Sequence, residues 1–124
     1  CPWGPRELDE ALTRIFAQSY PMLAPSIDVF TPLIYARKSG RGPDWGAGFL
    51  RDARQFVPAD RKVLLILDAL DAPDCLTATA ASEIPSWGLQ LYGGAEVFSD
   101  PAKAKVFRKA VEAIRSATAG GSGA

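Results

Sequence analysis

The polar side chains best suited to chemistry stand directly after three apolar runs of the sequence. They are Tyr35, Arg37 and Lys38 after the first run, Asp68 and Asp71 after the second, and Tyr92 and Glu96 around the third. Where such runs are parallel strands, ligands bind beyond the carboxyl ends of the strands. These residues therefore form the candidate site.

Two of these residues are carboxylates that could catalyse hydrolysis. Asp68 would act as nucleophile or base, and Glu96, beyond a Gly-Gly break, would act as general acid. Neighbouring strand axes lie about 4.8 Å apart, so either glycosidase geometry is within reach. Asp68 could instead cap the next turn by accepting backbone N–H bonds.

The candidate substrate-binding residues are Tyr35, Arg37, Tyr92 and Trp87. A tyrosine hydroxyl can donate to a sugar hydroxyl, and a tryptophan ring can stack on a sugar ring. Arg37, with its neighbour Lys38, could clamp a carboxylate or phosphate. Each also has a structural interpretation, as a core tyrosine, a packed indole or a solvated basic loop.

Composition removes several kinds of site. The chain has no histidine, which excludes a Ser-His-Asp or Cys-His nucleophile and a His-ligated zinc or haem. Cys1 and Cys75 are too few for a zinc cluster or a disulfide framework, and they could pair or remain as one terminal and one buried thiol. Asp68, Asp71 and Asp74 match no calcium loop. We therefore expect no metal and no cofactor.

We expect a small-molecule or carbohydrate substrate, and the charge balance and the short apolar runs argue against two other kinds of partner. The 124 residues include 14 basic and 14 acidic side chains, so no net field favours nucleic acid or anionic lipid. No apolar run approaches the roughly 20 residues of a membrane helix. We expect neither a nucleic-acid nor a membrane partner.

Three apolar runs alternate with segments of helical period. The pattern predicts helices at 5–20, 43–57, 73–81 and 101–118, and strands at 27–35, 62–70 and 88–98, the last broken at Gly93 and Gly94. Such alternation indicates an α/β fold with parallel strands and right-handed crossovers. We expect one domain over residues 1–118 and a flexible tail over 119–124.

Three local details of this pattern can be checked. The first helix should bury Leu8, Ala11, Leu12, Ile15 and Phe16, and the last should bury Val106, Phe107, Ala110, Val111 and Ile114. Ser99 and Asp100 should cap the last helix. Pro32 lies inside the first strand run, where it removes a ladder donor.

Three segments resemble a known family. The stretches AQSYPMLAPSIDVFTPLIYARKSGRGPDW, KVLLILDALDAPD and GLQLYGGAEVF are similar to the C-terminal part of bacterial (β/α)8-barrel proteins assigned as glycoside hydrolases. The positions that fit the family pattern are Asp28, Pro32, Tyr35, Arg37, Gly40, Arg41 and Trp45, whereas Thr31 and Leu33 replace the commoner Ser and Met.

The resemblance implies a partial barrel. The three strands would correspond to strands six to eight, and Asp68 would stand near the nucleophile that follows strand seven. The family's acid/base carboxylate follows strand four, which has no counterpart here. A whole barrel takes about 200 residues or more. We therefore expect this chain to pair with a missing half, with a copy of itself, or with a neighbour at the sheet edge.

The sequence leaves three functions open. The first is a carbohydrate hydrolase that uses Asp68, in a bacterial cytoplasm or cell envelope. The second is a non-catalytic α/β binding or assembly module. The third is an ester or lactone hydrolase whose carboxylate activates water without histidine.

Overall fold

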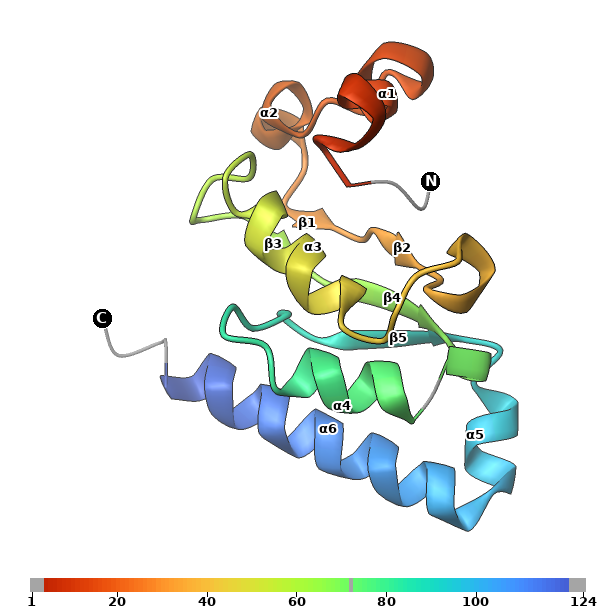
Figure 1. Ribbon diagram of the computed structural model, residues 1–124. Coiled ribbons are helices and arrows are strands. Elements are labelled where there is room, and N and C mark those ends of the chain that lie inside the picture. The colour runs from red at the N-terminus through yellow and green to blue at the C-terminus, as the bar shows by residue number, and fades with distance from the viewer. Residues whose placement is uncertain (1–3, 72, 121–124) are drawn as a thin grey trace.

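The computed structural model describes residues 4–71 and 73–120 as α-helices and short strands (Figure 1). The helices are α1 (Glu7–Phe16), α2 (Tyr20–Leu23), α3 (Trp45–Ala53), α4 (Asp74–Ala80), α5 (Ala95–Ser99) and α6 (Pro101–Gly120). The strands are β1 (Val29–Phe30), β2 (Leu33–Ile34), β3 (Lys62–Val63), β4 (Leu65–Asp68) and β5 (Leu89–Tyr92). Strands and helices alternate after α2, which confirms the expected α/β class.

Every strand pair is parallel, as predicted. β1 pairs with β3, and the remaining strands form a sheet in the order β2-β4-β5. The two small sheets share one register, because Val29 pairs with Lys62 and Leu33 with Ile66. The described residues form an open sheet and not a closed barrel.

Pro32 explains why the first strand run is divided. Its carbonyl accepts from the Ile66 N–H at 3.0 Å, and the Phe30 carbonyl accepts from the Leu64 N–H at 2.9 Å. Because proline has no N–H, the ladder loses one bond here. The run therefore forms two short strands, β1 and β2, although the backbone pairing continues before and after Pro32.

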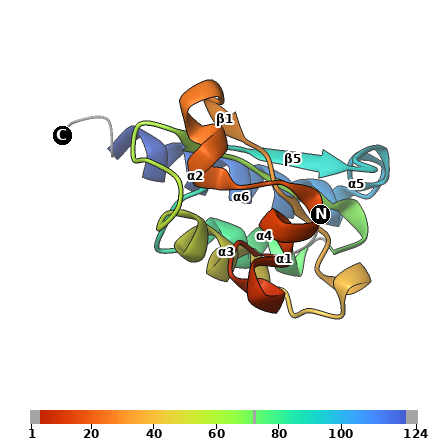
Figure 2. The same ribbon diagram turned by 90° about the horizontal axis from the view of Figure 1, so that it is seen from above.

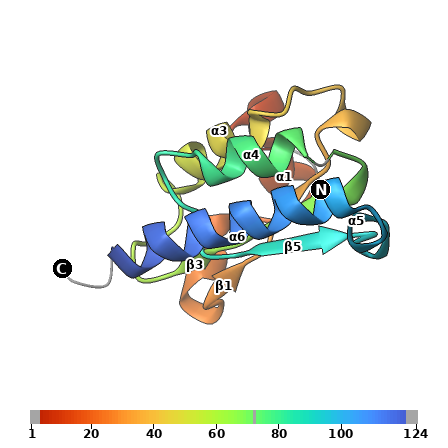
Figure 3. The same cartoon turned by 90° about the horizontal axis from the view of Figure 1, so that it is seen from below.

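Helices α3, α4 and α6 lie on one side of the strands (Figures 2 and 3). Gly46 allows α3 to approach closely, since a Cβ there would lie 3.2 Å from Leu65 Cδ1 and 3.3 Å from Ile34 Cγ2. Leu65 and Ile34 are fully buried beneath α3, together with Leu67. Over β2, β4 and β5, no helix formed by residues 4–71 and 73–120 covers the opposite face of the sheet (Figures 2 and 3).

The predicted buried face of the first helix is wrong. Ala11 and Leu12 are buried, but Leu8, Ile15 and Phe16 are exposed. Residues 8–10 have φ between 50° and 58°, in the left-handed region, so the regular helical period is broken in the first turn. The apolar stripe that an ideal helix would form therefore does not face the core.

The third run and the last helix differ in part from expectation. The strand ends at Tyr92, Gly93 has φ 72°, and residues 95–98 belong to α5 instead of continuing the strand. Asp100 caps α6 as predicted, because its Oδ1 accepts from the Ala102 N–H at 2.9 Å. In α6 the side chains of Ala110 and Ile114 are buried.

The ends of the chain limit two other predictions. α6 extends to Gly120, so Ala119 and Gly120, predicted to lie in a flexible tail, are helical. Residues 121–124 and Cys1 lie outside the described residues, and Cys75 is a buried free thiol. Within the described part of the chain, no helix is both long enough and apolar enough to cross a membrane.

Candidate functional site

The ends of three strands bring the predicted tyrosines and Asp68 together. Asp68 ends β4 and pairs in register with Tyr92, the last residue of β5. Tyr35 follows β2, whose Ile34 pairs with Leu67. Since side chains alternate along a strand, Asp68 and Tyr92 lie on the face opposite Leu67, which is the face without helices. We call Tyr35, Lys38, Asp68 and Tyr92 the carboxyl-edge cluster.

Asp68 is a buried carboxylate with one hydrogen-bond donor and one ion-pair partner. The residue is 3% exposed; its Oδ1 accepts from the Leu70 N–H at 3.0 Å, and Lys38 Nζ lies 2.6 Å from its Oδ2. Burial alone would raise the pKa of Asp68. The Lys38 ammonium and the Leu70 N–H outweigh that burial and hold the pKa below its usual value. The carboxylate is therefore ionised at neutral pH.

Lys38 sits against both tyrosine rings. Its Nζ lies 5.2 Å from the centre of the Tyr35 ring and 5.7 Å from that of Tyr92, and the two ring centres are 5.7 Å apart. These are cation–π distances. The hydrogen bond to Asp68 raises the pKa of Lys38, while burial, together with the nearby Tyr92 and Asp68, raises the pKa of Tyr35.

A second acid–base pair lies beside the cluster. The Arg37 backbone N–H donates to the Asp71 carboxylate, with its nitrogen 3.3 Å from Oδ1, and Arg37 Nε lies 3.8 Å from the same oxygen. Asp71 is buried, whereas the Arg37 side chain is 76% exposed. Asp71 thus fixes the loop after β2.

Arg37 and Asp71 also line a small pocket of about 160 Å³ that reaches Cys75. Burial, reinforced by the charges of Asp71 and Asp74, raises the pKa of the Cys75 thiol to about 11. The thiol is therefore protonated at neutral pH and is a poor nucleophile.

Two predicted site residues lie outside the cluster. Glu96 is exposed on α5, and its carboxylate makes no ion pair or hydrogen bond with residues 4–71 or 73–120. Trp87 precedes β5 and is half exposed, so it lies at the opposite end of that strand from Tyr92. The structure does not bring Trp87 to Asp68.

Lys38 is the residue whose importance the sequence reasoning underestimated. The turn Arg37–Ser39 is a 3-10 helix, which carries Lys38 back over the end of β4. The available signal was its position three residues after Tyr35, which is one helical turn. Arg41, in the same loop, is also paired: its Nη2 lies 2.7 Å from Glu7 Oε2, and its guanidinium lies 4.3 Å from the centre of the Trp45 ring.

The cluster has the chemistry of a nucleophile or base. An ionised carboxylate of lowered pKa can attack or accept a proton, whereas a general acid requires a raised pKa. Both Asp68 oxygens are occupied, so a substrate must displace the Lys38 ammonium to reach Oδ2. Among the described residues, no group of three acidic or cysteine side chains is placed to hold a metal ion.

Comparison with other proteins identifies no relative. No protein-family model, curated protein or solved structure matches this chain. The similarity to barrel glycoside hydrolases therefore rests on the sequence motifs quoted above.

Proposed function

We propose that this chain is a carbohydrate hydrolase with a carboxylate mechanism, built like the last units of a (β/α)8 barrel. One observation carries the proposal. Asp68 is buried and ionised at the carboxyl end of the central strand, on the face that has no helices. In a barrel, this is the inner face at the end where catalytic residues stand.

In this proposal the Lys38 side chain covers Asp68 Oδ2 in the free protein and moves away when substrate binds. Its side chain is 53% exposed, so its ammonium can leave Oδ2 when a sugar enters. The departing cation would leave Asp68 in contact with the reacting carbon or with water. Tyr35 and Tyr92 would then contact the sugar. Glu96, which lies outside the cluster in α5, would have to approach the leaving oxygen to protonate it.

The direct test is turnover of a panel of nitrophenyl glycosides by the chain and by Asp68→Asn. The variant keeps the shape of the side chain and can still accept the Leu70 N–H. We expect the rate on any hydrolysed glycoside to fall by roughly 10²–10⁴-fold. Asp71→Asn is the matched control, because it is also a buried carboxylate at the same edge. Equal losses in both variants, or full activity in Asp68→Asn, would contradict the proposal.

A specific observation also favours an assembly module. The helix-free face presents the partly buried side chains of Leu33, Leu64 and Ile66, and parallel sheets are normally covered on both faces. In this alternative the Lys38–Asp68 pair stays closed and a second polypeptide, such as another copy, covers the sheet. Turnover would then be absent in the parent chain as well as in Asp68→Asn.

Light scattering tests the assembly itself. We expect a species heavier than the 13.3 kDa chain. Ile66→Lys should restore the monomer because it places a charge on the helix-free face. Met22→Lys changes an exposed residue of α2 and should leave the mass unchanged. A stable monomer of the parent chain would contradict both the partial barrel and the assembly module.

A further inference from the structure

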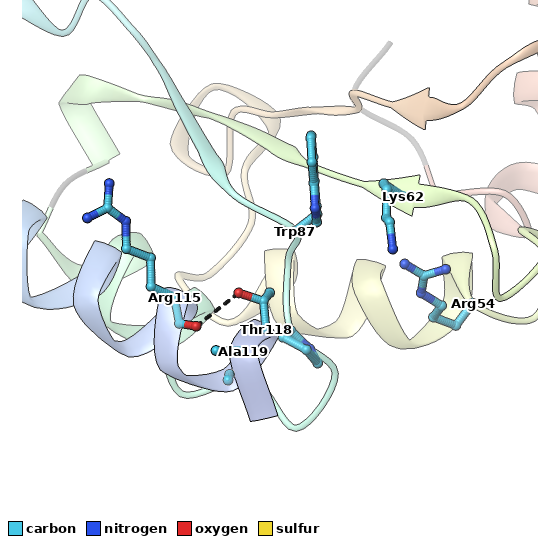
Figure 4. A pocket seen from close by; sticks show the side chains of 8 residues that line it. Arg54, Lys62, Trp87, Arg115, Thr118 and Ala119 are labelled. Carbon is cyan, nitrogen blue, oxygen red and sulfur yellow. Dashed lines mark hydrogen bonds between the residues drawn. The ribbon is translucent and has the colours of Figure 1, made fainter. Parts of the chain in front are cut away.

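A group of positively charged side chains that form no ion pair with residues 4–71 or 73–120 lies at the amino end of the sheet. A pocket of about 430 Å³ there is lined by Arg54, Lys62, Trp87 and Arg115, among others (Figure 4). These four residues come from the end of α3, the start of β3, the loop before β5 and the body of α6. The fold thus brings together three cations and an indole that are far apart in the sequence.

The cations of this pocket have no carboxylate partners among residues 4–71 and 73–120. None of them is in an ion pair, and no acidic side chain lines the pocket. In the view of Figure 4, the Lys62 ammonium and the Arg54 guanidinium point toward each other. Like charges repel at such a site unless an anion lies between them. The chain as a whole has equal numbers of basic and acidic residues, which makes this local excess distinctive.

Arg54 and Trp87 are held in place by the backbone. Arg54 Nη1 donates to the Arg61 carbonyl at 2.8 Å and to the Pro58 carbonyl at 3.4 Å, which orients the guanidinium and leaves further N–H donors. The backbone N–H of Trp87 donates to the Val63 carbonyl at 2.8 Å, while half of the residue's surface stays exposed. An exposed indole on a fixed backbone offers a flat surface on which a ring can stack.

The end of α6 explains only part of this arrangement. Carbonyl groups at a helix C-terminus carry partial negative charge and favour a nearby cation. That accounts for Arg115, but not for Lys62 on the sheet or for the exposed ring of Trp87.

We propose that this pocket binds a small ring compound that carries a phosphate monoester. The phosphate would accept hydrogen bonds from Arg54 and Lys62, and the ring would stack on Trp87. A dianionic phosphate suits the two cations Arg54 and Lys62 better than a single carboxylate does, whereas the Arg115 guanidinium lines the pocket but points away from them in Figure 4. The ring belongs to a phosphorylated sugar or to a nucleotide, since both stack on an indole. The site lies at the opposite end of the sheet from Asp68, so this proposal is independent of the proposed hydrolase.

Isothermal titration calorimetry of the full chain tests the site. The probes are glucose 6-phosphate with glucose, and adenosine monophosphate with adenosine. We expect at least one phosphate ester to bind with clearly higher affinity than its neutral partner, and the better of the two esters identifies the ring. Binding should weaken as sodium chloride is raised from 20 to 200 mM, because these charges are at the surface. Equal affinities for the esters and the neutral compounds, or no binding, would overturn the proposal.

Two variants separate a built site from general charge attraction. Lys62→Gln should weaken ester binding about tenfold, the loss of one charge-assisted hydrogen bond. Lys105→Gln removes the same charge from an exposed position of α6 outside the pocket and should have no effect. Trp87→Leu should weaken binding, whereas Trp87→Phe should keep most of it. If Lys62→Gln and Lys105→Gln behave alike, binding reflects net charge and the site is refuted.

Discussion

The two ends of the sheet handle positive charge in opposite ways. At the carboxyl end, Lys38 is paired with Asp68 and Arg37 with Asp71, and both carboxylates are buried. At the amino end, Lys62 and Arg115 have no such partner within the described residues. At the carboxyl end, the chain itself supplies an anion for each of these cations. At the amino end, the cations remain able to bind an anion from outside the chain.

We therefore expect the carboxyl end of the sheet to matter more for stability and the amino end to matter more for ligand binding. A buried carboxylate that loses its cation is left desolvated and unpaired, so the paired end should be sensitive to substitution. Exposed, unpaired cations contribute little to folding and can even oppose it. A site that reacts at Asp68 must first break an internal contact, whereas the amino-end pocket has none to break. The following predictions test this contrast.

The largest expected effect concerns the two carboxylates of the proposed hydrolase. Glu96→Gln should lower turnover of glycosides with poor leaving groups by roughly 10²–10⁴-fold and should spare those with good ones, which need little protonation. Asp68→Asn should impair both classes of substrate. The measurement is kcat/KM across a series of aryl glycosides. A Glu96→Gln loss that does not depend on the leaving group would show that Glu96 is not the acid.

The amino end depends on an uncharged buried group, Ser86. Its hydroxyl accepts from the Leu65 N–H at 3.1 Å and donates to the Gly88 carbonyl at 2.6 Å, which fixes the loop that carries Trp87. Ser86→Ala leaves both backbone groups unsatisfied, so we expect unfolding free energy to fall by about 1–3 kcal/mol. Urea denaturation measures this loss. Ser99→Ala, where an exposed hydroxyl donates to the Glu96 carbonyl, is the control and should cost much less.

The contribution of the Lys38–Asp68 pair to stability should depend on pH. The pKa of Asp68 is lowered in the folded chain, so its contribution to stability is present above the usual aspartate value of about 3.9 and is lost as pH falls through the folded value. The pKa of Lys38 is raised, so its contribution persists through neutral pH and is lost only in strong base. Lys38→Met should therefore melt below the parent chain between about pH 5 and 9.

Melting curves from pH 2.5 to 9 give the measurement. The difference in Tm between the parent chain and Lys38→Met should shrink as the solution is acidified below the usual aspartate value of about 3.9, and it should vanish once the pH is low enough to protonate Asp68 in both proteins. A difference that does not change with pH would mean that Lys38 stabilises through packing on Tyr35 and Tyr92 and not through its charge.

The sequence predicts the candidate site better than it predicts the first helix. Tyr35, Asp68 and Tyr92 converge because parallel strands end at a common edge, and the strand positions follow from apolar runs alone. The Lys38 contact depends on a 3-10 turn that apolar periodicity does not signal. The stripe that includes Leu8 and Ile15 was expected to be buried, but three left-handed residues, which no Gly or Asn marks, turn it outward.

Trp87 shows a second limit of such reasoning. The sequence predicts that Trp87 stacks on a substrate at the same site as Tyr92, yet a strand separates the ends that these residues occupy. Four residues of strand span about 13 Å, enough to place two nearby positions in different environments. The position of Trp87 before, and not after, the apolar run was the available signal.

The smallest expected effect concerns the unpaired cations at the amino end of the sheet. Because Lys62 points toward Arg54 in Figure 4 and forms no ion pair with residues 4–71 or 73–120, Lys62→Gln should relieve repulsion and raise stability by about 0.3 kcal/mol, a Tm increase of about 1–2 °C at low salt. The gain should vanish in 1 M sodium chloride, where the Debye length is about 3 Å. Lys105→Gln should leave Tm unchanged, and Lys38→Gln should lower it, since that lysine has a buried anion to neutralise. A drop in Tm for Lys62→Gln would mean that an internal partner already neutralises this charge, and the contrast between the two ends of the sheet would no longer hold.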